Sequence, residues 1–165
     1  MASITLKGNP VTTVGTLPKT GSKAPDFRLT TVNLTDVGLK DYSGKKKVLN
    51  INPSLDTGTC ATSARKFNEA VKNRSDVVVL NISADLPFAA KRFCEANGIE
   101  NVVPLSMMRD RKFGQDYGVA FTSGPLEGIL SRAVVVLDEN NTVVYTQQVP
   151  ETGQEPDYDA VWKVL

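Results

Sequence analysis

The chain has 165 residues, 41% of them hydrophobic and 22% charged, and its 19 basic and 18 acidic side chains give a net charge of +1. This composition excludes a disordered chain and predicts one folded domain over residues 1–165. So balanced a charge gives no electrostatic reason to expect binding to nucleic acid or to an anionic membrane.

An N-terminal β-hairpin is the first predicted element. Segments 4–7 and 10–14 have the character of short strands and flank the two-residue turn Gly8-Asn9. A loop rich in Gly, Pro, Thr and Ser follows over residues 15–25. The basic run 45–47 is interpreted as a solvated turn that leads into a strand.

Strands and helices alternate along the rest of the chain. Apolar runs predict strands over residues 27–30, 47–52, 77–82, 102–105, 133–137 and 142–147. Helical periodicity and terminal residues predict helices over residues 60–72, 85–96, 112–117 and 156–165. This alternation predicts an α/β fold with a mixed central sheet flanked by helices.

The sequence carries no signal for export or for membrane insertion. Met1 to Leu6 contain no basic segment before a long apolar one, and no apolar run approaches the roughly 18 residues of a membrane span. We therefore expect a cytoplasmic protein, in which a cysteine pair is more often catalytic or redox-active than structural. The absence of histidine and the presence of only two cysteines exclude the usual zinc ligand sets, and we expect no metal or other cofactor.

The first cysteine, Cys60, lies between a predicted strand and a predicted helix. It ends the run Pro53-x-x-x-Thr57-x-x-Cys60, and Thr57 or Thr59 is placed to cap the helix. Free N–H groups and the dipole at a helix N-terminus favour an anion, and the thiolate is the nucleophilic form of cysteine. The position therefore predicts a reactive thiol that works without a histidine base, although a free cysteine is often only a small core residue.

The second cysteine, Cys94, lies within the predicted helix 85–96. Together with Leu86, Ala90 and Phe93 it fits the apolar face of that helix. On this pattern alone, Cys94 is interpreted as a core residue.

The run that ends at Cys60 resembles the active-site signature of the peroxiredoxins, cysteine enzymes that reduce hydroperoxides on a thioredoxin-like fold. The flanking residues 52–60, together with 82–89 and 92–94, sharpen the resemblance to the bacterial thiol peroxidase subfamily. Further segments that resemble this subfamily are Gly124-Pro125-Leu126, 132–139 and 155–158. The match extends over essentially the whole chain, including the hairpin.

The resemblance implies an antioxidant enzyme, a thiol-dependent peroxidase that reduces hydrogen peroxide and organic (alkyl or lipid) hydroperoxides to water and alcohols. The Cys60 thiolate is implied to attack the peroxide, while the Thr57 hydroxyl directs the peroxide toward the sulfur. Arg132 is implied to hold the thiolate and the polarised peroxide; without the resemblance it would be a surface arginine at the start of a strand. Pro53 is implied to shield the site, or only to shape its loop.

The resemblance also implies a role for the second cysteine. Cys94 would condense with the sulfenic acid on Cys60 to give an intrasubunit disulfide, which thioredoxin would reduce. Two separate helices rarely place cysteine Cα atoms within the roughly 7 Å that a disulfide needs, so we expect local unwinding around both residues during turnover. A homodimer is a further expectation from the resemblance.

Other functions of a thiol protein fit the sequence less well. A thioredoxin-type disulfide exchange protein needs two cysteines two residues apart, whereas Ala61, Thr62 and Ser63 follow Cys60. A cysteine hydrolase normally requires a histidine base, and the chain has none. A thiol-based redox sensor with the same fold and thiol pair stays an alternative, which consumption of cumene hydroperoxide with thioredoxin would distinguish.

Overall fold

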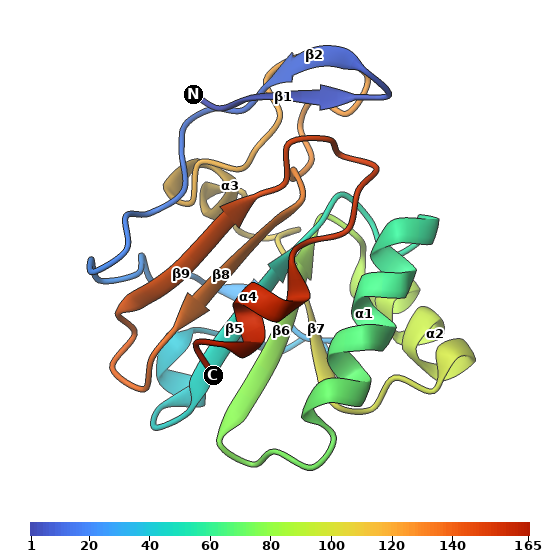
Figure 1. Ribbon diagram of the computed structural model, residues 1–165. Coiled ribbons are helices and arrows are strands. Elements are labelled where there is room, and N and C mark those ends of the chain that lie inside the picture. The colour runs from blue at the N-terminus through green and yellow to red at the C-terminus, as the bar shows by residue number, and fades with distance from the viewer.

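A seven-stranded mixed sheet forms the centre of the computed structural model, which describes residues 1–165 (Figure 1). In order across the sheet the strands are β4 (Asp36–Val37), β3 (Leu29–Thr30), β7 (Val102–Ser106), β6 (Val77–Ser83), β5 (Lys46–Ile51), β8 (Ala133–Leu137) and β9 (Val143–Gln148). β5, β6 and β7 run parallel, whereas β8 and β9 are antiparallel to their neighbours. The predicted mixed sheet is confirmed.

Helices cover both faces of this sheet (Figure 1). One face carries α1 (Gly58–Val71), α2 (Pro87–Asn97) and α4 (Tyr158–Trp162), and the other carries the 3-10 helix η1 (Leu39–Tyr42) and α3 (Lys112–Asp116). None of the helices combines the length and the apolar character that a membrane-spanning segment needs.

The alternation of side chains along β5 explains why the sheet needs two cores. Val48 packs in the core beneath α1, while its neighbour Leu49 packs in the core on the opposite face. Because successive strand residues point to opposite faces, a strand that is apolar at both positions must be covered on both sides. The buried runs of β5, β6 and β8 meet this requirement.

The predicted elements match the structure except in short segments and at some ends. The two-residue strand β4 and the helix η1 were not predicted, and α4 is shorter than the predicted helix 156–165. The second helix begins at Pro87 rather than at Asp85, because the Asp85 carboxylate binds elsewhere.

The prediction of a solvated turn for the basic run 45–47 is wrong for its last two residues. Lys46 and Lys47 belong to β5, and Lys47 is fully buried. Its ammonium group donates to the carbonyl of Lys45 at 2.9 Å. Burial lowers the pKa of Lys47, and the negative charges of Asp138 and Glu139 oppose this shift.

The predicted hairpin is present as β1 (Ser3–Leu6) and β2 (Asn9–Thr12), which form a separate two-stranded sheet. The turn is Lys7-Gly8 rather than Gly8-Asn9, because Leu6 pairs with Asn9. Lys7 and Gly8 both have positive φ angles, 51° and 80°, as the tight turns that suit a twisted hairpin require.

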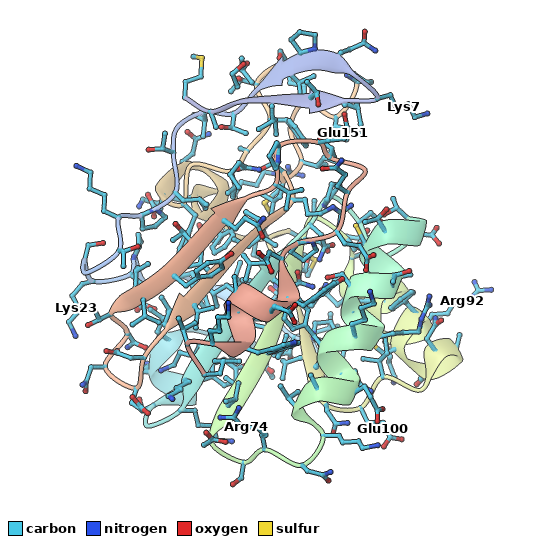
Figure 2. All side chains as sticks on the ribbon, viewed as in Figure 1. Lys7, Lys23, Arg74, Arg92, Glu100 and Glu151 are labelled. Atoms are coloured by element: carbon cyan, nitrogen blue, oxygen red, sulfur yellow. The ribbon has the colours of Figure 1, made fainter.

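A carboxylate outside the hairpin fastens this turn to the rest of the protein. Glu151, in the loop after β9, accepts hydrogen bonds from the Thr5 hydroxyl at 2.7 Å and from the amides of Lys7 and Gly8 at 3.0 and 3.1 Å. It also accepts from the amide of Gly153 at 3.1 Å. These bonds, that of Thr5 first, lower the pKa of Glu151 to about 2. Figure 2 shows Glu151 beside the turn that carries Lys7.

We expect Glu151→Gln to lower the free energy of unfolding at neutral pH and to have no effect in strong acid. Because the folded state lowers the pKa of Glu151 from 4.5 to about 2, the stability that its carboxylate contributes is present above pH 4.5 and is lost as the pH falls toward about 2. Urea unfolding of both proteins across this range measures the difference. A difference that persists unchanged at the acid end would contradict the account.

Candidate active site

Strand pairing brings Cys60 and Arg132 together although 72 residues separate them in the chain. β5 ends at Ile51, whose partner on the antiparallel neighbour is Ala133, the first residue of β8. The loop from β5 to α1 and the residue before β8 therefore leave the sheet at the same edge. The topology places the start of α1 over this edge.

The Arg132 guanidinium contacts the Cys60 sulfur directly. Nη1 of Arg132 lies 3.2 Å from Sγ of Cys60, and Nε donates to the carbonyl of Thr152 at 2.9 Å. Arg132 is 3% exposed and Cys60 0%, so water barely screens the pair. A guanidinium stays protonated in proteins, so the Cys60 sulfur lies beside a permanent positive charge. The interpretation of Arg132 as a surface residue is wrong.

The first turn of α1 has no side-chain cap. Thr57 occupies the N-cap position with extended backbone angles, but its hydroxyl accepts no bond from the helix amides. Instead it donates to the carbonyl of Ser54 at 3.2 Å, and the hydroxyl of Thr59 donates to the carbonyl of Gly153 at 2.9 Å. The prediction that Thr57 caps the helix is therefore confirmed for its position, but neither Thr57 nor Thr59 makes a side-chain cap bond. The N–H groups next to Cys60 stay open to an anion or a peroxide oxygen.

Asp85 holds the loop between β5 and α1 and was not predicted to belong to the site. Its carboxylate accepts from the hydroxyl of Ser54 and from the amide of Leu55, both at 2.7 Å, and from the hydroxyl of Ser83 at 3.0 Å. Pro53 is buried at the start of the same loop. The signal in the sequence is that Asp85 is the second residue after β6, the parallel neighbour of β5, so both loops leave the same sheet edge.

Three asparagines lie on the face of the sheet beneath α1, among residues that are otherwise apolar. The side-chain amides of Asn50 and Asn52 both donate to Oδ1 of Asn81 at 2.9 Å, and the hydroxyl of Ser63 on α1 donates to Oδ1 of Asn50 at 3.4 Å. Ser63 and Cys60 are buried on the inner face of α1. Polar groups thus interrupt the apolar packing under the first turns of this helix.

Cys94 lies in a different environment from Cys60. It is half-buried on α2, next to α1, and both thiols are free in the structure (Figure 1). Burial, followed by the charge of Glu95, raises the pKa of Cys94 to about 11. Of the predicted apolar face, Ala90 is buried, but Leu86 is 55% exposed because it precedes the helix.

This arrangement can support nucleophilic attack by a thiolate without an imidazole base. The sulfur is held beside a permanent cation at a helix N-terminus, and a second thiol lies on the neighbouring helix. A thiolate in such a place can attack an oxygen or another sulfur. The fold and the site define the class: a thiol-dependent redox protein with a thioredoxin-like fold.

Comparison with known proteins gives the particular family. The Redoxin family model matches residues 19–162. A thiol peroxidase from Corynebacterium glutamicum is 51% identical over 165 residues, which cover 100% of this chain and 99% of that protein. Among solved structures, a peroxiredoxin-like protein from Aquifex aeolicus superposes with a TM-score of 0.92 at 41% identity, covering 99% of this chain and 95% of that one.

A thiol peroxidase from Chromobacterium violaceum superposes with a TM-score of 0.91 at 26% identity, covering 98% of this chain and 94% of that one. The chain belongs to the Redoxin family and is a thiol peroxidase, one of the peroxiredoxin enzymes. The fold, the family and the peroxidase activity implied by the sequence resemblance are confirmed.

We expect Cys94 to stay protonated, and therefore slow to alkylate, until strongly alkaline pH. In Cys60→Ser, where Cys94 is the only thiol, the iodoacetamide rate should rise with pH until about 11 in the folded protein, because burial raises the pKa of Cys94. In urea the rise should level off near the ordinary value of 9.0. Identical pH profiles in the two conditions would show that the fold does not suppress this thiol.

Proposed function

We propose that the peroxidase reaction takes place at Cys60. Its thiolate attacks the terminal oxygen of a hydroperoxide, so that a sulfur–oxygen bond forms and the oxygen–oxygen bond breaks. The leaving alkoxide, or the hydroxide from hydrogen peroxide, takes up a proton from solvent and departs as an alcohol or as water. Cys60 is thereby oxidised by two electrons to a sulfenic acid.

One observation carries this proposal: Nη1 of Arg132 lies 3.2 Å from the Cys60 sulfur in a site from which water is excluded. The guanidinium stays protonated at ordinary pH, so it offers the site a permanent positive charge on a planar group with directed N–H donors. Such a charge stabilises the thiolate before attack and the negative charge that develops on the leaving oxygen.

Thr57 and Pro53 are proposed to orient the peroxide and to exclude water. The Thr57 hydroxyl gives its proton to the carbonyl of Ser54, so its oxygen is free to accept a hydrogen bond from the O–H group of a peroxide. The uncapped amides of α1 can donate to the peroxide oxygens at the same time. Pro53 is buried at the start of this loop, a position that supports a role in shielding the site.

A groove along the loop that leads to Cys60 supports organic hydroperoxides as substrates in addition to hydrogen peroxide. It has a volume of about 630 Å³ and runs between the loop that follows β5 and the helix α2. Leu55, Phe88 and Phe93 line it, and Phe88 is 67% exposed. These apolar side chains offer a surface for the alkyl part of a larger hydroperoxide.

Cys94 is proposed to resolve the sulfenic acid within the same subunit. Its thiolate attacks the Cys60 sulfur, the sulfur–oxygen bond breaks as the disulfide forms, and the oxygen leaves as hydroxide, which takes up a proton from solvent to become water. Burial raises the pKa of Cys94 to about 11, so α2 must open before this thiol becomes reactive. The polar layer of Asn50, Asn52 and Asn81 under α1 favours a matching opening there, because it weakens apolar packing.

The remaining parts of the proposal concern the reductant, the oligomeric state and the cellular location of the enzyme. Thioredoxin is the proposed reductant, because its dithiol can reduce an internal disulfide and regenerate both thiols. We further propose that residues 1–165 act as a single domain, that two chains form a homodimer, and that the enzyme works in the cytoplasm.

Cys60→Ser should abolish the consumption of cumene hydroperoxide with a thioredoxin system while the protein stays folded. A serine hydroxyl is not ionised near neutral pH and cannot take the place of the thiolate. NADPH oxidation by thioredoxin reductase, coupled to the reaction, measures the turnover. Appreciable turnover by this variant would show that the reaction takes place elsewhere.

Cys94→Ser should consume about one peroxide per subunit and then stop, because the sulfenic acid on Cys60 has no partner within the chain. Dimedone labelling and mass spectrometry would detect this sulfenic acid. The wild-type protein should instead form the Cys60–Cys94 disulfide, without a covalent dimer on non-reducing gels. Thioredoxin-dependent turnover of Cys94→Ser at the wild-type rate would mean that the reaction uses only one cysteine.

A further inference from the structure

We propose that Glu151 is a positioning residue for the active site, although it touches neither Cys60 nor Arg132. By fastening the N-terminal hairpin to the loop after β9, it holds in place the two carbonyl groups that orient the Arg132 guanidinium and the first turn of α1. This inference rests on the proposed roles of Cys60 and Arg132 and adds a residue that acts through them.

The outer side of the loop is joined to the hairpin. The amide of Thr5 donates to the carbonyl of Pro150, and the amide of Thr152 donates to the carbonyl of Thr5, both at 2.8 Å. Thr5 and Glu151 are thus paired as in a parallel sheet. The Glu151 carboxylate also accepts hydrogen bonds from Thr5 and from the turn Lys7-Gly8. These bonds hold the turn of the hairpin against the loop (Figure 2).

The inner side of the same loop is joined to the active site. The carbonyl of Thr152 accepts from Nε of Arg132, and the carbonyl of Gly153 accepts from the hydroxyl of Thr59, each at 2.9 Å. Thr59 directly precedes Cys60 in the first turn of α1. Residues 151–153 therefore connect the hairpin on one side to the cation and to the helix start on the other.

The orientation of the Arg132 guanidinium depends on this loop, whereas the position of the Arg132 backbone does not. The carbonyl of Arg132 accepts from the amide of Val149 at 3.0 Å and from the side chain of Gln148 at 2.9 Å, so β9 fixes the main chain. The bond from Nε to Thr152 is what sets the plane of the guanidinium. Because the group is planar, a shift of that carbonyl changes the approach of Nη1 to the Cys60 sulfur.

A carboxylate is needed at position 151 because four donors converge on its two oxygens: the Thr5 hydroxyl and the amides of Lys7, Gly8 and Gly153. An amide of the same size has one oxygen, and its nitrogen cannot accept hydrogen bonds. Glu151→Gln therefore loses acceptors on one side of the loop while it keeps the volume of the side chain.

The test measures the peroxide step separately from the reduction step. In single-turnover reactions with hydrogen peroxide, Glu151→Gln should react about tenfold more slowly than the wild type, as expected when a catalytic group is slightly misplaced. Reduction of the Cys60–Cys94 disulfide by dithiothreitol should keep its rate, because the local unwinding that we expect in the disulfide form separates the Cys60 sulfur from the guanidinium. Glu100→Gln is the matched control, an exposed carboxylate far from Glu151 (Figure 2), and should behave as the wild type in both steps.

A double-mutant comparison distinguishes positioning from a general loss of stability. With Arg132→Lys as background, Glu151→Gln should slow the peroxide step less than about twofold, because the planar group it orients is gone. Should Glu151→Gln fail to fold, Thr5→Val removes one donor to the carboxylate and should give a smaller loss of the same kind.

Two results would overturn the inference: a wild-type peroxide rate in the folded Glu151 or Thr5 variant, or an equal loss from Glu151→Gln with and without the Arg132 guanidinium. A different result would contradict the proposed function, namely peroxidase turnover by Cys60→Ser. An inactive Cys60→Ser together with a fully active Glu151→Gln removes only the positioning role.

Discussion

The contact between the Arg132 guanidinium and the Cys60 sulfur is the interaction on which the rest of the site depends. A cation that is 3% exposed is costly unless acceptors surround it, and here the Cys60 sulfur and the carbonyl of Thr152 contact the guanidinium. The antiparallel pairing of β5 with β8 brings the two residues to one sheet edge. The loop after β9 reaches the same edge because β9 is antiparallel to β8.

The two cysteines differ in what surrounds their sulfur atoms. Cys60 faces a permanent cation and the open amides of a helix start, whereas Cys94 lies half-buried on α2 with its pKa raised to about 11. In the proposed reaction, this difference determines which cysteine reacts first. Peroxide meets a thiolate only at Cys60, and Cys94 becomes a nucleophile once α2 opens and water lowers its pKa again.

The long strands and the position of Cys60 at a helix start could be predicted from the sequence, while the supports of the site could not. Long apolar runs mark the strands, and β8 was predicted with its observed bounds because all five of its residues are buried. Thr152 acts through its carbonyl, which every residue type has, so no pattern identifies it. Asp85 looks like a helix start until the neighbouring strands are known, and Glu151 acquires its role only when the hairpin folds back on its loop.

The most direct measurement of the central claim is the single-turnover rate of Arg132→Lys with hydrogen peroxide, alongside the thiolate absorbance of Cys60 at neutral pH, measured in a Cys94→Ser background. A lysine keeps the positive charge but loses the planar fork that joins the sulfur to the carbonyl of Thr152. The account predicts that the rate falls by about tenfold or more and that the thiolate signal decreases. An unchanged rate with an unchanged thiolate signal would mean that the contact does not contribute to the reaction.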